Sequence, residues 1–174
     1  MATIDSSVTV NQLFVRAVIG PSDFTPVVQP FTNNMTMAHQ MALALLFESG
    51  IPTMADYADN YLSEPMLEFY SALPAARKNT IFLSGEPDAY YCGAVETKDG
   101  RWLVGCANSF VESSVEVDFS FLGDGEYTVT LITDSDTGNS EVAVEKSTVT
   151  KNDKRTITAA RDGGFVILLT KNAA

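Results

Sequence analysis

The stretch SVEVDFSF, Ser114 to Phe121, decides how the second half of the chain folds. Apolar side chains occupy every second position and polar ones lie between them: Val115, Val117, Phe119 and Phe121 against Glu116, Asp118 and Ser120. A two-residue period sends alternate side chains to opposite faces of a strand. The stretch therefore predicts a strand with one buried face, and we expect Glu116 and Asp118 to be exposed.

Six further segments between residues 90 and 170 also resemble strands. Asp99 and Gly100 lie between the first two and are a strong hairpin signal. The turns LGDGEY and SDTGNS separate others. Short strands joined in this way predict an antiparallel β-sandwich. The predicted strands are residues 90–95, 101–107, 113–119, 126–132, 142–149, 155–159 and 164–170, and the side chains expected to point inward are Val115, Val117, Phe119, Tyr127, Val129 and Leu131.

The first half of the chain has helical features instead. Residues 37–49, MAHQMALALLFES, predict a buried helix with Thr36 or Asn34 as its N-cap. A second helix is predicted after Ser63, which can cap it, with Pro65 in the first turn. A short helix near residues 53–56 is a further expectation. The period changes near residue 85, which predicts two regions, 1–84 and 85–174.

An apolar, β-branched run precedes these helices. Residues 14–19 predict a buried strand that Gly20 and Pro21 stop just before Asp23. A barrel enzyme presents a carboxylate to its substrate in this way, at the end of a strand. Asp23 is therefore the candidate catalytic residue. A glycosidase needs two carboxylates across the scissile bond, and one does not suffice.

Charge and hydropathy exclude several partners. The chain has 174 residues and a formal net charge of −11, which repels nucleic acid and anionic membrane surfaces. Its longest apolar run, residues 41–47, is too short to span a bilayer, and we expect no export signal at its start. We expect neither a nucleic-acid nor a membrane partner.

Three further residues could carry chemistry. His39 is the only histidine, and its apolar helix favours a hydrogen-bonded structural role over a catalytic triad. Cys92 and Cys106 lie on the two strands of one predicted hairpin, as a disulfide or as two buried thiols. They lack a CxxC spacing, so we predict no metal site.

Trp102 is the one candidate for carbohydrate binding. Together with Tyr90, Tyr91 and Phe110 it could form an aromatic platform for a sugar ring. The alternative is that Trp102 packs in the core against the helical part. The alternation of RWLVGCA does not decide between the two.

Several motifs, in order, resemble the C-terminal part of glycoside hydrolase family 97, the bacterial α-glucosidases and α-galactosidases. They are GPSDFTP (20–26), AHQMA (38–42), FES (47–49), EPMLEF (64–69) and the later DAYYCGAVETKDGRWLVGCANS and DFSFLGDGEYTVTLITD. The resemblance runs from about Val10 to Leu169. It implies an α+β fold, in which a helical remnant of the end of a (β/α)8 barrel is followed by an antiparallel β-sandwich.

The resemblance also implies where the chemistry lies. In that family the catalytic carboxylates and the calcium-binding glutamates precede the segment matched here, so we expect no cofactor in this chain. The arginine usual before the motif AHQMA is missing from VQPFTNNMTMAHQ. We therefore expect an accessory or oligomerisation region that is inactive alone. The alternatives are an α-glycosidase competent only with an upstream barrel and a carbohydrate-binding module. The family is often periplasmic.

Self-association, or association with a barrel domain, is the expected partnership. A strand at residues 14–19 without its barrel neighbours has an unpaired edge, and the helix at 37–49 lacks its cover. We expect a two-fold dimer that pairs those edges or buries the face of Met37, Met41 and Leu45, or else partial disorder of this region.

Overall fold

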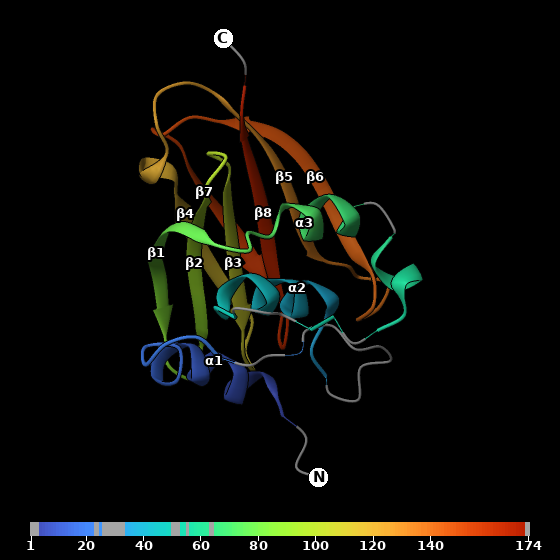
Figure 1. The fold of residues 1–174 in the computed structure, drawn as a ribbon. Helices are drawn as coiled ribbons and strands as arrows, with labels where there is room; N and C mark the ends of the chain where they lie inside the picture. The colour runs from blue at the N-terminus through green and yellow to red at the C-terminus, as the bar shows by residue number, and fades with distance from the viewer. Residues whose placement is uncertain are drawn as a thin grey trace.

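The fold is a six-stranded antiparallel sheet with helices on one face and a two-stranded sheet on the other. It is seen in a computed structural model that describes residues 4–22, 25, 34–49, 53–54, 56–62 and 65–172. Figure 1 shows α2 lying across the sheet and α1 beside the end of its first strands. The α+β class and the antiparallel sandwich predicted from the sequence are confirmed.

All seven predicted strands are present, with small differences at their ends, and an eighth precedes them. The order in the large sheet is β1-β2-β3-β8-β5-β6, and β4 pairs with β7 in the small sheet. Every pairing is antiparallel. The strands are β1 (Arg77–Glu86), β2 (Tyr90–Thr97), β3 (Trp102–Asn108), β4 (Ser113–Asp118), β5 (Tyr127–Asp134), β6 (Val142–Val149), β7 (Lys154–Ala159) and β8 (Gly164–Lys171).

The strand β1 was not predicted. It is ten residues long, it forms one border of the large sheet, and it pairs with β2 through two register irregularities. The change of period at residue 85 therefore falls inside this strand. Ile81 and Leu83 pack on the core between the sheets, while Phe82 lies against aromatic rings that include Phe14. Since apolar residues occupy both faces, β1 lacks the clean alternation that marks a half-wet strand.

The predicted strand at residues 14–19 is wrong. Residues 6–15 form the helix α1 (Ser6–Val15), and residues 16–19 continue as turns. Asp5 is the N-cap, and its carboxylate accepts a hydrogen bond from the Val8 amide at 3.0 Å. Val10 and Leu13 are buried. Packing of this face outweighs the low helix propensity of the β-branched residues.

The predicted helix at 37–49 is confirmed as α2 (Met37–Leu46), and Thr36 is its N-cap, 3.1 Å from the His39 amide. It packs closely on the sheet because two strand glycines leave room. A Cβ at Gly105 would lie 3.3 Å from Leu45 Cδ2, and one at Gly93 would lie 3.2 Å from Leu46 Cδ2. Backbone and helix therefore approach more closely than larger residues would permit.

The second predicted helix is α3 (Met66–Ala72), but Pro65 occupies its N-cap position and makes no side-chain cap. Ser63, predicted as the cap, lies outside the described residues. No helix is seen at the described positions among residues 53–56, and a 3-10 helix follows instead, η1 (Ala58–Tyr61). A second one, η2 (Phe119–Phe121), ends the strand predicted to reach Phe119.

Two cores share the large sheet. One lies between the sheet and the helices, and the other lies between the two sheets. The predicted inward set is confirmed in the second core: Val115, Val117, Phe119, Tyr127, Val129 and Leu131 are all buried. Glu116 is exposed, and Asp118 is half-buried.

The expectation that α2 lacks cover is wrong. Met37, Met41 and Leu45 are at most 1% exposed within the single chain, because α2 packs against β3 and β8. No second copy is needed to bury this face. The alternative dimer, which pairs strand edges at residues 14–19, is also wrong because these residues form no strand.

Candidate functional site

The expected barrel-end site cannot be built around its carboxylate. Asp23 lies outside the described residues. The two residues before it are described, and the Ser22 amide donates a hydrogen bond to the Glu48 carbonyl at 2.8 Å. This bond places the segment next to the end of α2.

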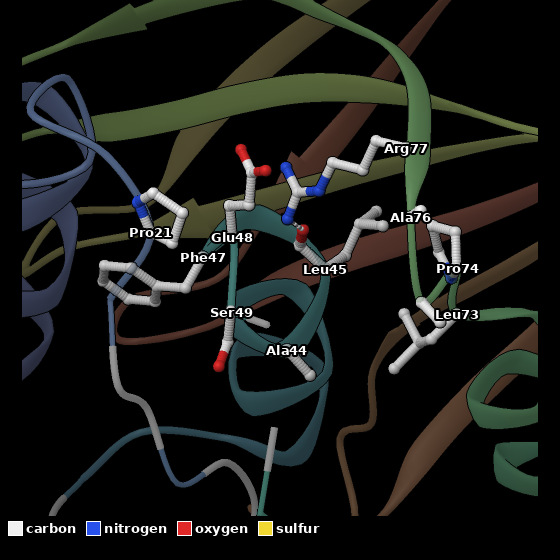
Figure 2. Close-up of a pocket in the computed structure, with 11 residues that line it drawn as sticks. Pro21, Ala44, Leu45, Phe47, Glu48, Ser49, Leu73, Pro74, Ala76 and Arg77 are labelled. Carbon is white, nitrogen blue, oxygen red and sulfur yellow. Dashed lines mark hydrogen bonds between the residues drawn. The ribbon is translucent and has the colours of Figure 1, made fainter. Parts of the chain in front are cut away.

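A pocket of about 250 Å³ opens at this point, between the end of α2 and the start of β1. Figure 2 shows Pro21 and Phe47 on one side, Leu73 and Pro74 on the other, and Arg77 reaching in. The walls combine apolar side chains with the polar side chains of Glu48, Ser49 and Arg77. The complete lining is Pro21, Ala44, Leu45, Phe47, Glu48, Ser49, Leu73, Pro74, Ala75, Ala76 and Arg77.

Arg77 has a structural task in this pocket. Its Nη2 donates a hydrogen bond to the Leu45 carbonyl oxygen at 2.6 Å, which satisfies one of the carbonyls left open at the end of α2. Burial lowers the pKa of the guanidinium, and the nearby Glu48 carboxylate opposes that shift. Arg77 was missed by sequence reasoning because it begins a strand that was not predicted.

The described lining of the pocket does not contain the pair of carboxylates that glycosidic chemistry needs. Among the described residues that line it, Glu48 is the one carboxylate, and it is exposed. General acid catalysis with a nucleophile or base needs a second carboxylate roughly 5 to 10 Å away. Nor do the described parts of the chain hold a group of three His, Cys, Asp or Glu side chains suited to a metal ion.

His39 has the structural role that was predicted. It is fully buried, its Nδ1 lies 2.9 Å from the Gly163 carbonyl oxygen, and its Nε2 lies 3.0 Å from Thr9 Oγ1. A carbonyl only accepts, so Nδ1 carries the proton in the neutral ring. Burial lowers the pKa of His39 to about 4, against smaller opposing effects from the Gly163 and Asn108 backbone and from Asp162. The histidine joins α2, α1 and the turn before β8.

Carboxylates complete this buried junction. Asp134 accepts hydrogen bonds from Thr36 Oγ1 at 2.5 Å and from the Gly164 amide at 2.9 Å, while Asp162 accepts from Ser6 Oγ at 2.5 Å. Burial raises the pKa of Asp134, against these hydrogen bonds. The cluster holds the β7–β8 turn against the helices. Each of these groups has a partner within the chain.

Trp102 is 6% exposed and lies in the core between the two sheets. Its ring centroid is 4.8 Å from that of Phe121. The core-packing alternative describes this position, although the packing is on the face opposite to the helices. Little of the ring remains for a sugar.

An exposed apolar surface lies where α1 meets β1. The rings of Phe14, Phe82 and Tyr91 pack edge to face, with centroids 5.1 to 6.1 Å apart. Phe82 is nevertheless 52% exposed. Val15, Val18 and Ile19, which follow Phe14 along the chain, are also exposed. The rings of Phe14, Phe82 and Tyr91 are called the ring patch below.

Among the described residues, no helix has the length and apolarity needed to cross a membrane.

The comparisons with known proteins agree with one another. Residues 77–170 match the family described as "Glycosyl-hydrolase 97 C-terminal, oligomerisation". A retaining alpha-galactosidase of Bacteroides thetaiotaomicron is 29% identical over 171 residues, covering 88% of this chain and 26% of the relative. A probable retaining alpha-galactosidase of Streptomyces bingchenggensis is 32% identical, covering 89% of this chain and 24% of the relative.

A solved structure has the same fold. It is a glycoside hydrolase family 97 enzyme of Pseudoalteromonas sp. strain K8 in complex with acarbose, with a TM-score of 0.88 at 24% identity. The match covers 97% of this chain and 29% of that one. The chain thus spans about a quarter of the length of the curated relatives it matches.

Proposed function

Because the chain belongs to the glycosyl-hydrolase 97 C-terminal family, we propose that it is a non-catalytic accessory region that joins copies of the protein. The observation that carries the proposal is the family match over the sandwich, residues 77–170, a family described by oligomerisation. The pocket beside α2 supports the non-catalytic part, since its described lining offers one carboxylate.

The contact surface proposed is the border strand β1 with the ring patch. No charged residue lies between Lys78 and Glu86, and Phe82 projects from the middle of this uncharged stretch. Exposed apolar side chains on an unpaired edge are a site for association. Figure 1 shows β1 at one border of the sheet with α1 beside its end.

The opposite border is less suited to association. In β6, Glu145 and Lys146 occupy the middle of the strand, and Glu145 forms an ion pair with Arg155 at 2.5 Å. Charged side chains discourage pairing at a sheet edge. The register irregularities of β1 interrupt a long backbone ladder, so the contact proposed is between side chains across a two-fold axis.

Sedimentation velocity of the 174-residue chain at micromolar concentration tests the proposal. We expect a dimer, and we expect Phe82→Ser to shift it toward monomer. The matched control is Val144→Ser, because Val144 is 44% exposed on the opposite border and its loss leaves the proposed contact intact. A monomeric wild-type chain, or equal weakening by both variants, would overturn the proposal. Circular dichroism verifies that each variant is folded.

We also propose that the α-glycosidase chemistry of the longer relatives depends on residues outside this chain. In this proposal residues 1–84 correspond to the end of a barrel and residues 85–174 to the sandwich, although β1 begins before that boundary. Incubation with chromogenic α-galactosides and α-glucosides in the presence of calcium should give no turnover. Turnover that Asp23→Ala abolishes would contradict this part.

A further inference from the structure

Cys92 and Cys106 lie directly opposite each other on β2 and β3. Both thiols are free, fully buried and part of the core between the two sheets. Two thiols in such positions are either inert core residues or the two halves of a bond. The pairing pattern of the hairpin decides which role the geometry permits.

The turn fixes that pattern. The Thr97 amide donates to the Arg101 carbonyl at 2.9 Å, and the Gly100 amide donates to the Thr97 carbonyl at 3.1 Å, so Thr97 and Arg101 form a hydrogen-bonded pair. Hydrogen-bonded and non-hydrogen-bonded pairs alternate along an antiparallel ladder. The pairs 96/102, 94/104 and 92/106 are therefore non-hydrogen-bonded, and 95/103 and 93/105 are hydrogen-bonded.

The difference matters for sulfur chemistry. In a non-hydrogen-bonded pair the Cα atoms are about 4.5 Å apart and the side chains are closer than in the alternate pairs. A disulfide requires Cα atoms roughly 4.4 to 6.8 Å apart. The register thus brings Cys92 and Cys106 within the range of a bond without separating the strands.

We infer that Cys92 and Cys106 form a cross-strand disulfide when the chain folds in the presence of a small disulfide oxidant. Each cysteine loses its thiol proton, one S–S bond forms, and the two electrons and two protons reduce the oxidant's S–S bond to two thiols. The inference does not depend on the proposed oligomerisation.

The disulfide should form while the chain is folding and not after folding is complete. A thiolate is the attacking species in exchange, and burial, with the neighbouring Cys92 thiol, raises the pKa of Cys106. Neither sulfur is accessible to an oxidant in the folded core. Oxidation therefore occurs while the hairpin closes. Once formed, the bond joins the open end of the hairpin, away from its Asp99–Gly100 turn.

Refolding of the full chain tests the inference. Reduced, unfolded protein is diluted into buffers with stated ratios of oxidised to reduced glutathione, and free thiols are then blocked with N-ethylmaleimide. Trypsin separates the two cysteines into peptides 79–98 and 102–146, which remain linked only by the bond. The fraction of peptides that remain linked, at each glutathione ratio, gives the effective concentration of one cysteine thiol relative to the other. This value is measured in native buffer and in concentrated guanidinium chloride.

We expect the effective concentration in native buffer to exceed that in denaturant by about tenfold or more. An equal or lower value would show that the fold opposes the bond and would overturn the inference. Cys106→Ala checks the assay, since it should give only glutathione adducts. A pair moved to the hydrogen-bonded register, Val95→Cys with Leu103→Cys in a chain lacking the native thiols, should give a lower value. An equal value there would contradict the register argument, and if that variant does not fold the wild-type ratio alone decides.

Discussion

Acidification should destabilise the fold through one buried side chain, His39. Its pKa is about 4 in the folded chain and about 6.5 when exposed. Between these values the unfolded chain binds more protons than the folded one. The free energy of unfolding therefore falls as pH falls through this window, and the stability is fully present above about pH 6.5.

The magnitude follows from the two pKa values. A shift of one pKa unit corresponds to about 1.4 kcal/mol, so the full window is worth about 3 kcal/mol. Of this, about 1.4 kcal/mol should be lost by pH 5.5 and about 2.5 kcal/mol by pH 4.5. The raised pKa of Asp134 acts in the opposite direction, since its protonation favours the folded state just above its ordinary range. The decline should therefore flatten at the acidic end.

One feature of the hydrogen bonding opposes this prediction. Thr9 Oγ1 donates to the Ser6 carbonyl at 2.8 Å, so its lone pair can accept from His39 Nε2 if that atom gains a proton. A charged His39 would then have partners on both nitrogens. Desolvation of the charge in a fully buried position is the larger effect, and the predicted slope depends on this ordering.

Urea unfolding at several pH values between 7.5 and 4.5, followed by the fluorescence of Trp102, measures the effect. The wild-type chain is compared with His39→Gln, which keeps a polar side chain but cannot titrate. The variant starts less stable, and only the difference in slope matters. Parallel loss of stability in the two proteins would refute the reasoning and show that His39 is protonated without cost.

Two further substitutions, both beside α2, are tested by urea unfolding. Arg77→Met keeps the apolar stem but removes the hydrogen bond to the Leu45 carbonyl, and it should cost about 1.5 to 2 kcal/mol; an unchanged midpoint would show that water replaces the guanidinium. Gly164→Ala should cost about 2 to 3 kcal/mol, because the new Cβ would lie 2.2 Å from the Cys106 carbonyl oxygen. Wild-type stability in that variant would mean that β3 and β8 can move apart freely.

The sandwich could be predicted from the sequence because its signals are local. The alternation around Val115 and Val117 arises because one face of the strand is buried and the other faces solvent. The Asp99–Gly100 turn determines the pairing of the two strands that it joins. The strand β1 could not be found in this way, since Ile81 and Phe82 both meet apolar surfaces on opposite faces. The residues that cover its two faces decide its state, and some of them, such as Phe14, are distant in sequence.

The ring patch, which is the proposed contact site, was less predictable from the sequence for a related reason. Residues 14–19 have strand-like composition, yet the preceding residues bury Val10 and Leu13 at helical spacing behind an Asp5 cap. Those two signals were present in the sequence and favour the helix. The exposure of Phe82 was not present in it, because exposure depends on how α1 lies against β1.

The sharing of one sheet by two cores affects how the strands find their alignment. In β3 every residue is buried and, apart from Asn108 at its end, the strand is largely apolar, so a slip by one position would change the polarity of each face little between Trp102 and Ala107. The slipped register must therefore be excluded by steric clashes. Gly105 lies beneath Leu45 and Leu46, and a slip would bring the side chain of Val104 or Cys106 into a space that has no room for it. A glycine in contact with a helix thus fixes the register of a strand whose two faces differ little in polarity.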